Sequence, residues 1–223
     1  MSRGPRAAAI VATLLAASLL AAAPAQAQWR LEGGASVGRG EHRVDSGFGV
    51  VTASGTLLGA RIQARGLDDL LEVGIHASGG QLTAQESSVE RVDRTLGEIG
   101  ADASLLAMPW LALQGTATIR GYDMVPAVQR WTTFGAGAEL RLDFAGGAVR
   151  GLARMALLPH VAASGMPAPD FGVASGAGVQ ATRGRLTAGL DYALERYTFA
   201  PDAAGVTRHE QLSRLVLRLA GRW

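Results

Sequence analysis

The chain has 223 residues, of which 30 are Gly and none is Cys; 48% are hydrophobic and 18% are charged. The high apolar fraction excludes a disordered chain. The absence of Cys excludes a disulfide framework, a thiolate metal site and a Cys nucleophile. All 21 basic residues are Arg, set against 19 acidic residues.

The first 27 residues predict an export signal. Arg3 and Arg6 precede a largely apolar run over residues 7–23, and Pro24-Ala25-Gln26-Ala27 supplies the small residues of a signal-peptidase site. The alternative is a membrane anchor, for which the run is short, since a span needs about 20 residues. Cleavage after Ala27 would remove both arginines and leave 19 basic against 19 acidic residues in 28–223. Nothing in that charge predicts a nucleic-acid partner.

The remainder of the chain alternates with period two. In residues 111–120 the odd positions are apolar or Gly, and the even positions from Gln114 onward are polar. This pattern predicts strands with one apolar and one polar face, and no helical period competes over a comparable length. The predicted strands are 28–38, 57–64, 69–79, 92–105, 110–122, 131–144, 148–157, 171–182, 185–199 and 209–223.

The predicted connections alternate between long and short after the first strand. The long ones are 39–56, 80–91, 123–130, 158–170 and 200–208, and the short ones are 65–68, 106–109, 145–147 and 183–184. Unequal loop lengths at the two ends of an antiparallel meander are typical of outer-membrane barrels, with short turns in the periplasm. We therefore predict an all-β, antiparallel, up-and-down transmembrane β-barrel of about 10 strands, with eight strands as the alternative.

Aromatic residues favour lipid on the outside of this barrel. Trp29, Trp110 and Trp223 fall at the predicted periplasmic strand ends, and Trp131 falls at an opposite end. Membrane barrels carry aromatic girdles at both interfaces, so we predict these four as membrane-interface residues. Trp110 and Trp131 lie on the polar parity, however, which leaves capping of the lumen as their alternative position. A soluble periplasmic ligand-binding barrel is the competing architecture.

The C-terminal segment Ser213–Trp223 alternates apolar residues and ends in an aromatic. It resembles the C-terminal signal of bacterial outer-membrane barrels, although the usual last residue there is Phe. The resemblance implies that the barrel-insertion machinery reads this segment. It extends to the architecture of the whole mature chain and identifies no subfamily.

The polar parity predicts a lumen filled with paired charges. Folding the last hairpin between 204 and 205 places Asp191 across from Arg218 and Glu195 across from Arg214. Folding 131–144 onto 148–157 places Glu139 across from Arg154 and Asp143 across from Arg150. Pairing offsets the cost of burying ions. The predicted lumen network comprises Glu98, Asp102, Arg120, Glu139, Arg141, Asp143, Arg150, Arg154, Asp191, Glu195, Arg214 and Arg218.

A weak catalytic candidate is His76-Ala77-Ser78 with Glu90. A base, a nucleophile and an acid suit acyl transfer, and the H-x-S spacing is similar to a motif of lipid A deacylases. The residues Gly79-Gly80 depart from that motif, and the pair points by parity into the lumen. A polar pair near the outer rim is therefore the preferred interpretation. The four His residues show no metal-ligand spacing, so no metal and no cofactor are predicted.

These observations predict an exported, monomeric outer-membrane barrel with a structural, surface-interaction or narrow-pore role. Its partners would be outer-membrane lipids and the barrel-insertion machinery, with no nucleic acid. A lipid-modifying hydrolase and a soluble periplasmic ligand-binding barrel are the alternatives.

Overall fold

The computed structural model describes residues 29–47, 49–85, 91–124 and 127–223. The predicted export signal at residues 1–27 lies outside this range. Ten strands follow one another in chain order, interrupted by a single 3₁₀ turn, η1 (Ala145–Gly147). The strands are β1 (Arg30–Asp45), β2 (Val50–Gly66), β3 (Leu71–Gln85), β4 (Arg91–Met108), β5 (Leu111–Met124), β6 (Ala127–Phe144), β7 (Val149–Ala163), β8 (Phe171–Arg183), β9 (Leu186–Thr198) and β10 (His209–Arg222).

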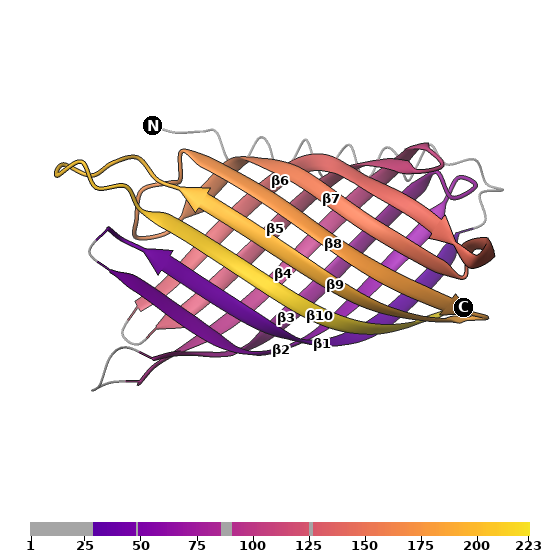
Figure 1. Cartoon of the computed structure of the whole chain (residues 1–223), viewed down its shortest axis with the longest axis horizontal. Helices are drawn as coiled ribbons and strands as arrows, with labels where there is room; N and C mark the ends of the chain where they lie inside the picture. The colour runs from indigo at the N-terminus through magenta and orange to yellow at the C-terminus, as the bar shows by residue number, and fades with distance from the viewer. Residues whose placement is uncertain (1–28, 48, 86–90, 125–126) are drawn as a thin grey trace.

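The ten strands form one closed barrel (Figure 1). Each strand pairs antiparallel with its neighbour in sequence, and β1 closes the ring by pairing with β10. In this closing seam Gly38 lies opposite Val216. Closure leaves no free sheet edge, which is how a barrel satisfies every strand's backbone hydrogen bonds. The predicted up-and-down barrel is confirmed, with ten strands rather than eight.

The barrel has two unlike ends. One end carries the short turns at residues 67–70, 109–110, 145–148 and 184–185, and we call it the turn end. The opposite end, where β1 is followed by β2 and β9 by β10, is the loop end. At the turn end Leu67, Asp68 and Asp69 all have positive φ, as does Gly184. Left-handed backbone of this kind allows tight hairpins whose twist matches the flanking strands.

The strands extend farther toward the loop end than the alternation predicts. β1 continues to Asp45 and β2 starts at Val50, so most of the predicted long connection 39–56 is strand. The outward positions of this extension include the exposed Arg39, Arg43 and Thr52. In this extension both faces of the strands carry polar side chains, so the alternation of apolar and polar residues disappears. The hydrogen-bonded ladder between β1 and β2 nevertheless continues.

A bulge explains one specific boundary error. The predicted strand 148–157 stops before Pro159, whereas β7 continues to Ala163. The register between β6 and β7 shifts by one residue, because Ala136 pairs with Leu157 but Phe134 pairs with His160. A bulge tolerates Pro because the inserted residue is not part of the regular ladder. It also turns both Leu158 and Val161 inward, where they are buried.

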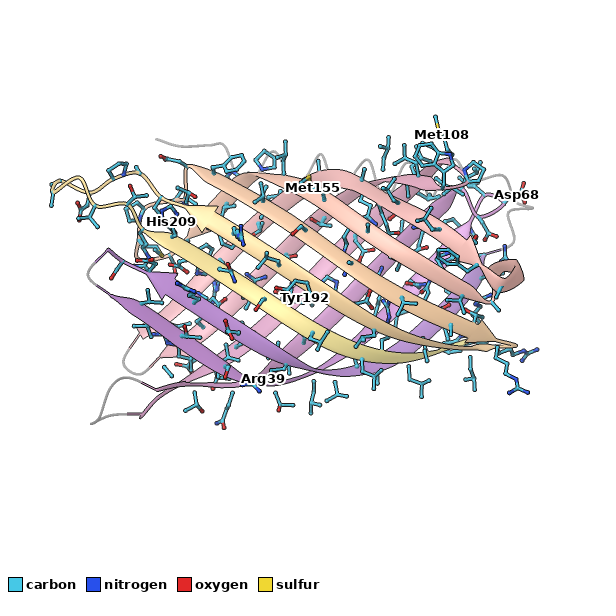
Figure 2. All side chains as sticks on the ribbon, viewed as in Figure 1. Arg39, Asp68, Met108, Met155, Tyr192 and His209 are labelled. Atoms are coloured by element: carbon cyan, nitrogen blue, oxygen red, sulfur yellow. The ribbon has the colours of Figure 1, made fainter. Side chains whose placement is uncertain are left out.

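The two faces of the wall are chemically opposite. Large apolar side chains stand exposed on the outside of every strand, including Met155 and Tyr192 (Figure 2). Charged and hydroxyl side chains fill much of the inside. Among the described residues, no helix combines the length and hydropathy needed to cross a bilayer.

Candidate functional site: the barrel interior

A group of buried charges crosses the middle of the barrel interior. Glu98 accepts hydrogen bonds from Arg120 Nε at 2.7 Å and from Arg214 Nη1 at 2.5 Å. Glu195 accepts from Arg120 Nη2 at 2.8 Å and from Arg214 Nη2 at 2.7 Å. We call these four residues the brace. They come from β4, β5, β9 and β10, two adjacent pairs of strands separated by three strands on either side, so the brace joins opposite walls.

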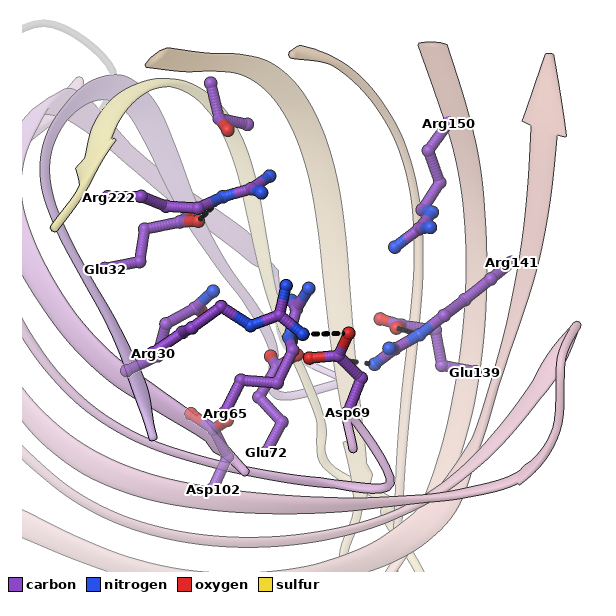
Figure 3. Close-up of polar contacts among 12 residues, drawn as sticks. Arg30, Glu32, Arg65, Asp69, Glu72, Asp102, Glu139, Arg141, Arg150 and Arg222 are labelled. Carbon is purple, nitrogen blue, oxygen red and sulfur yellow. Dashed lines mark hydrogen bonds and ion pairs between the residues drawn. The ribbon is translucent and has the colours of Figure 1, made fainter. Parts of the chain in front are cut away.

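Arginine–carboxylate pairs continue toward the turn end, where side chains from several strands point toward one another (Figure 3). Arg61 Nη2 lies 2.6 Å from Asp102 Oδ2, and Arg65 Nη2 lies 2.7 Å from Glu72 Oε2. Near the opening, Arg30 pairs with Asp69, and Arg222 donates to Glu32 at 3.2 Å. All twelve residues of the predicted lumen network have an oppositely charged partner, at distances from 2.5 to 3.8 Å.

The individual pairs differ in part from those predicted. In the last hairpin Asp191 lies opposite Val216, and Glu195 lies opposite Leu212, so the predicted register is wrong by two residues. Both ion pairs nevertheless form diagonally, because a shift of two keeps each side chain on the same face. Between β6 and β7 the predicted register is correct, with Glu139 opposite Arg154. Even so, Glu139 pairs with Arg141 at 2.8 Å instead.

An apolar cluster fills the interior on the loop side of the brace. Trp131 is 1% exposed, and its ring lies 5.0 Å from that of Tyr197 and 6.1 Å from that of Phe199. The Tyr197 hydroxyl donates to Glu195 at 2.6 Å and so connects the cluster to the brace. We call the cluster the apolar plug; it consists of Ala53, Leu57, Leu82, Ala84, Leu96, Tyr122, Trp131, Leu158, Val161, Tyr197 and Phe199.

The plug corrects one predicted position. Trp131 lies inside the barrel and not at a membrane interface, as its polar parity allowed. Trp110 and Trp223 are exposed at the turn end. Trp29 is half-buried there, and its ring covers Gly66 closely enough that a Cβ on that residue would lie 2.7 Å from it. Parity was the available signal, because Tyr122, Trp131 and Tyr197 occupy inward positions of their strands.

The catalytic candidates do not assemble as a Ser–His pair. His76 Nε2 lies 3.6 Å from Glu98 Oε1, and its Nδ1 lies 3.7 Å from Asp102 Oδ1. Both ring nitrogens therefore face carboxylates. Ser78 Oγ is buried and has no hydrogen-bond partner among the described residues, so nothing in this arrangement withdraws its proton. Glu90 lies outside the described residues. No sequence pattern indicated that Glu98 and Asp102 would be the neighbours of His76.

A cavity of about 330 Å³ occupies the interior between the brace and the turn end. Its lining includes eight Arg and six acidic side chains, together with His76 and Ser78. Thr and Gln side chains of β5 complete the polar wall. Within the part of the chain that the structure describes, no group of three or more His, Cys, Asp or Glu side chains is arranged to hold a metal ion.

No protein-family model matches the chain, and no curated protein matches it in sequence. Its fold is similar to the outer membrane protease OmpT from Escherichia coli, at 9% identity and a TM-score of 0.49 over 90% of this chain and 98% of that one. The β domain of the Bordetella autotransporter BrkA gives 16% identity and a TM-score of 0.47, over 83% and 98%. The attachment invasion locus protein Ail of Yersinia pestis gives 14% and 0.34, over 86% and 98%.

Proposed function

We propose that the chain is an integral outer-membrane barrel with a sealed interior and a structural or surface-interaction role. The single observation that carries this proposal is the band of large apolar side chains exposed around the whole closed ring. Soluble monomers rarely expose contiguous apolar patches above a few hundred Å². A surface apolar on every strand is suited to lipid, where a closed barrel satisfies its own backbone.

The height of the band fits a bilayer. On β5 the outward positions from Leu111 to Ile119 are apolar or Gly, and Asp123 is the first exposed charge. On β1 the band starts at Leu31 and stops below the exposed Arg39. These lengths agree with the roughly 9–11 residues of a tilted transmembrane strand. Exposed Trp110 and Trp223 border the band at the turn end, as interfacial aromatics do.

This architecture supports an orientation in which the turn end faces the periplasm and the loop end faces outward. Membrane barrels carry their short turns on the periplasmic side. The strands project beyond the band at the loop end, where Arg39 and Arg43 are exposed. We infer that the projecting wall and its connections form the surface available to partners. We also propose that the barrel is monomeric and that the insertion machinery recognises Ser213–Trp223.

The filled interior supports a sealed barrel over a narrow pore. Small barrels have interiors that side chains can fill, whereas open channels occur at about 16–18 strands. Here the apolar plug and the brace occupy successive levels of the lumen, and Trp131, Tyr122 and Leu82 are almost completely buried. An ion would have to displace apolar packing at one level and paired charges at the next.

Two measurements test the proposal. Cell fractionation and gel migration with and without heating should find a heat-modifiable protein in the outer membrane, and recovery only in the soluble periplasm would overturn the membrane assignment. In planar bilayers the refolded protein should give no conductance steps, with a general porin as the positive control. Stable conductance steps would overturn the sealed barrel and support the narrow pore instead.

A further inference from the structure

The charge in the cavity on the turn side of the brace is unbalanced. Eight guanidinium groups line it against six carboxylates. The four brace residues balance one another, with Glu98 and Glu195 facing Arg120 and Arg214. A second balanced group surrounds Glu72, which faces three arginines, two of which also pair with Asp102 or Glu139. This group of three arginines and three carboxylates consists of Arg61, Arg65, Arg141, Glu72, Asp102 and Glu139. The surplus of positive charge therefore lies elsewhere in the lining.

Three arginines of the lining and the carboxylate of Asp191 remain. Arg150 is neutralised at 2.5 Å by Asp143, which lies outside the lining, so the surplus is concentrated at Arg154 and Arg218. Both face one carboxylate, that of Asp191, which Arg218 Nη2 approaches at 2.9 Å and Arg154 Nη2 only at 3.8 Å. Asp191 is the sole charged partner of Arg154 among the described residues. The Arg154 side chain is 36% exposed and lines the cavity. Two guanidinium groups that share one carboxylate leave a net positive charge and unused N–H donors directed at the same space.

Glycines of β8 make room for this pair. A Cβ on Gly176 would lie 2.6 Å from Arg154 Nε, and a Cβ on Gly178 would lie 2.4 Å from Asp191 Oδ1. Either side chain would push the charged groups away from the wall. Gly176 and Gly178 thus allow Arg154 and Asp191 to lie close to the backbone of β8.

The cavity also contains buried polar atoms without a partner. Ser78 Oγ has no hydrogen-bond partner among the described residues. His76 Nδ1 and Asp102 Oδ1 face each other at 3.7 Å, which is beyond hydrogen-bond distance, and all three residues line the cavity. Buried polar groups are normally hydrogen-bonded, because leaving them unpaired costs the free energy of their lost solvation. A ligand or solvent that carries hydroxyl groups would satisfy them.

We propose that this cavity binds a small hydroxylated organic anion, with Arg154 and Arg218 as the ligands of its carboxylate or phosphate group. The planar fork of a guanidinium group can donate two hydrogen bonds to a pair of oxygens of either anion. The volume of about 330 Å³ suits a small molecule, at the lower end of the usual range for ligand pockets. The apolar plug closes the loop side, so the anion would enter from the turn end, past Arg30 and Arg222 (Figure 3).

Isothermal titration calorimetry on the refolded barrel in detergent micelles tests this site. Citrate supplies the hydroxy-carboxylate probe and glycerol 3-phosphate the hydroxy-phosphate probe, and we expect saturable binding of at least one. Arg154→Gln should weaken that binding about tenfold, as loss of a charge-assisted hydrogen bond does. The matched control is Arg183→Gln, which removes the same charge from an exposed position of β8 and should leave affinity unchanged.

A second variant separates binding from structure. Asp191→Asn removes the carboxylate that competes for Arg154 and Arg218, so affinity should rise, whereas damage to the fold would lower it. Heat-modifiable migration verifies that each variant is folded. Binding of citrate alone identifies a carboxylate ligand, and binding of glycerol 3-phosphate alone identifies a phosphate ligand. Absence of saturable binding for both, or equal affinity of the wild type and Arg154→Gln, would overturn the proposal.

Discussion

Arg120 and Glu195 meet across the interior of the barrel, with Nη2 of the arginine 2.8 Å from Oε2 of the carboxylate. Their strands, β5 and β9, are separated by three others along the shorter way round the ring. The contact is therefore a cross-link between walls and not a pair within one sheet ladder. Because Arg214 and Glu98 complete it from β10 and β4, the brace ties the two halves of the barrel together.

Removing one brace arginine should be costly. In Arg120→Met, Glu98 and Glu195 are left with Arg214 as their remaining arginine, and breaking a buried ion pair typically costs about 3–5 kcal/mol. We expect a loss of this size in the free energy of unfolding, measured by urea titration of the barrel in lipid vesicles. The matched control is Arg150→Met, since its partner Asp143 is 44% exposed at the turn end and exposed pairs contribute about 0–1 kcal/mol. Equal losses of unfolding free energy in the two variants would contradict the proposed cross-linking role of the brace.

Tryptophan fluorescence should distinguish the inside of the wall from the outside. Trp131 is buried in the apolar plug, while Trp110 and Trp223 are exposed at the turn end. In single-tryptophan variants reconstituted in brominated lipids, we expect strong quenching of Trp110 and Trp223 and little quenching of Trp131. The other tryptophans are replaced by Phe. Strong quenching of Trp131 would place it at the lipid interface after all.

The seam between β1 and β10 should not tolerate a side chain at Gly38. A Cβ there would lie 2.3 Å from the carbonyl oxygen of Leu215, which belongs to the backbone of the facing strand. Overpacking of this kind costs about 1–3 kcal/mol, so Gly38→Ala should lower the free energy of unfolding by that amount. Gly115→Ala is the control, because nothing lies within 4 Å of its added Cβ. If both variants match the wild type, the seam is looser than the structure indicates.

The loop end should respond to acid through Glu210. This residue pairs with Val44, on the loop side of the exposed Arg39, and is buried. Burial favours a higher pKa, but the hydrogen bonds from His42 at 3.0 Å and from Arg208 at 2.8 Å outweigh it and hold the pKa of Glu210 below its ordinary value of 4.5.

A carboxyl group whose pKa is lowered by folding stabilises the protein above its unfolded pKa and loses that contribution as pH falls through the folded pKa. The stability difference between the wild type and Glu210→Gln should therefore be largest near neutral pH and shrink below about pH 4.5. Urea titrations of both proteins across this range give the measurement. A difference that does not depend on pH would rule out the ionised carboxylate as its source.

Local sequence patterns predicted much of the fold. The two-residue alternation around Leu113 and Ile119 identified strands, and the spacing of short turns gave their number and antiparallel order. The alternation failed to predict the strand boundaries where the outer face is not apolar or the ladder is irregular. Beyond Arg39 the outward face is polar, so a strand continued without alternating. At Pro159 a bulge allowed a residue that a regular ladder excludes.

The interior could be predicted only in part. Parity assigned charged residues such as Glu98 and Arg214 to the lumen, because successive side chains of a strand point to opposite faces. Ion-pair partners within a hairpin could be predicted approximately, because a register error of two residues leaves each side chain on the same face of the sheet. Ion-pair partners on opposite walls of the lumen could not be predicted, because the sequence does not specify which residues of opposite strands lie at the same height.

The sequence by itself determined an alternating, Cys-free chain and a barrel topology, because alternation and turn spacing act between near neighbours. The tertiary structure decided the closure of β1 on β10, the inward position of Trp131 and the surplus of charge at Arg154. Each depends on the tilt and stagger of ten closed strands, which bring residues far apart in the chain to one level of one lumen.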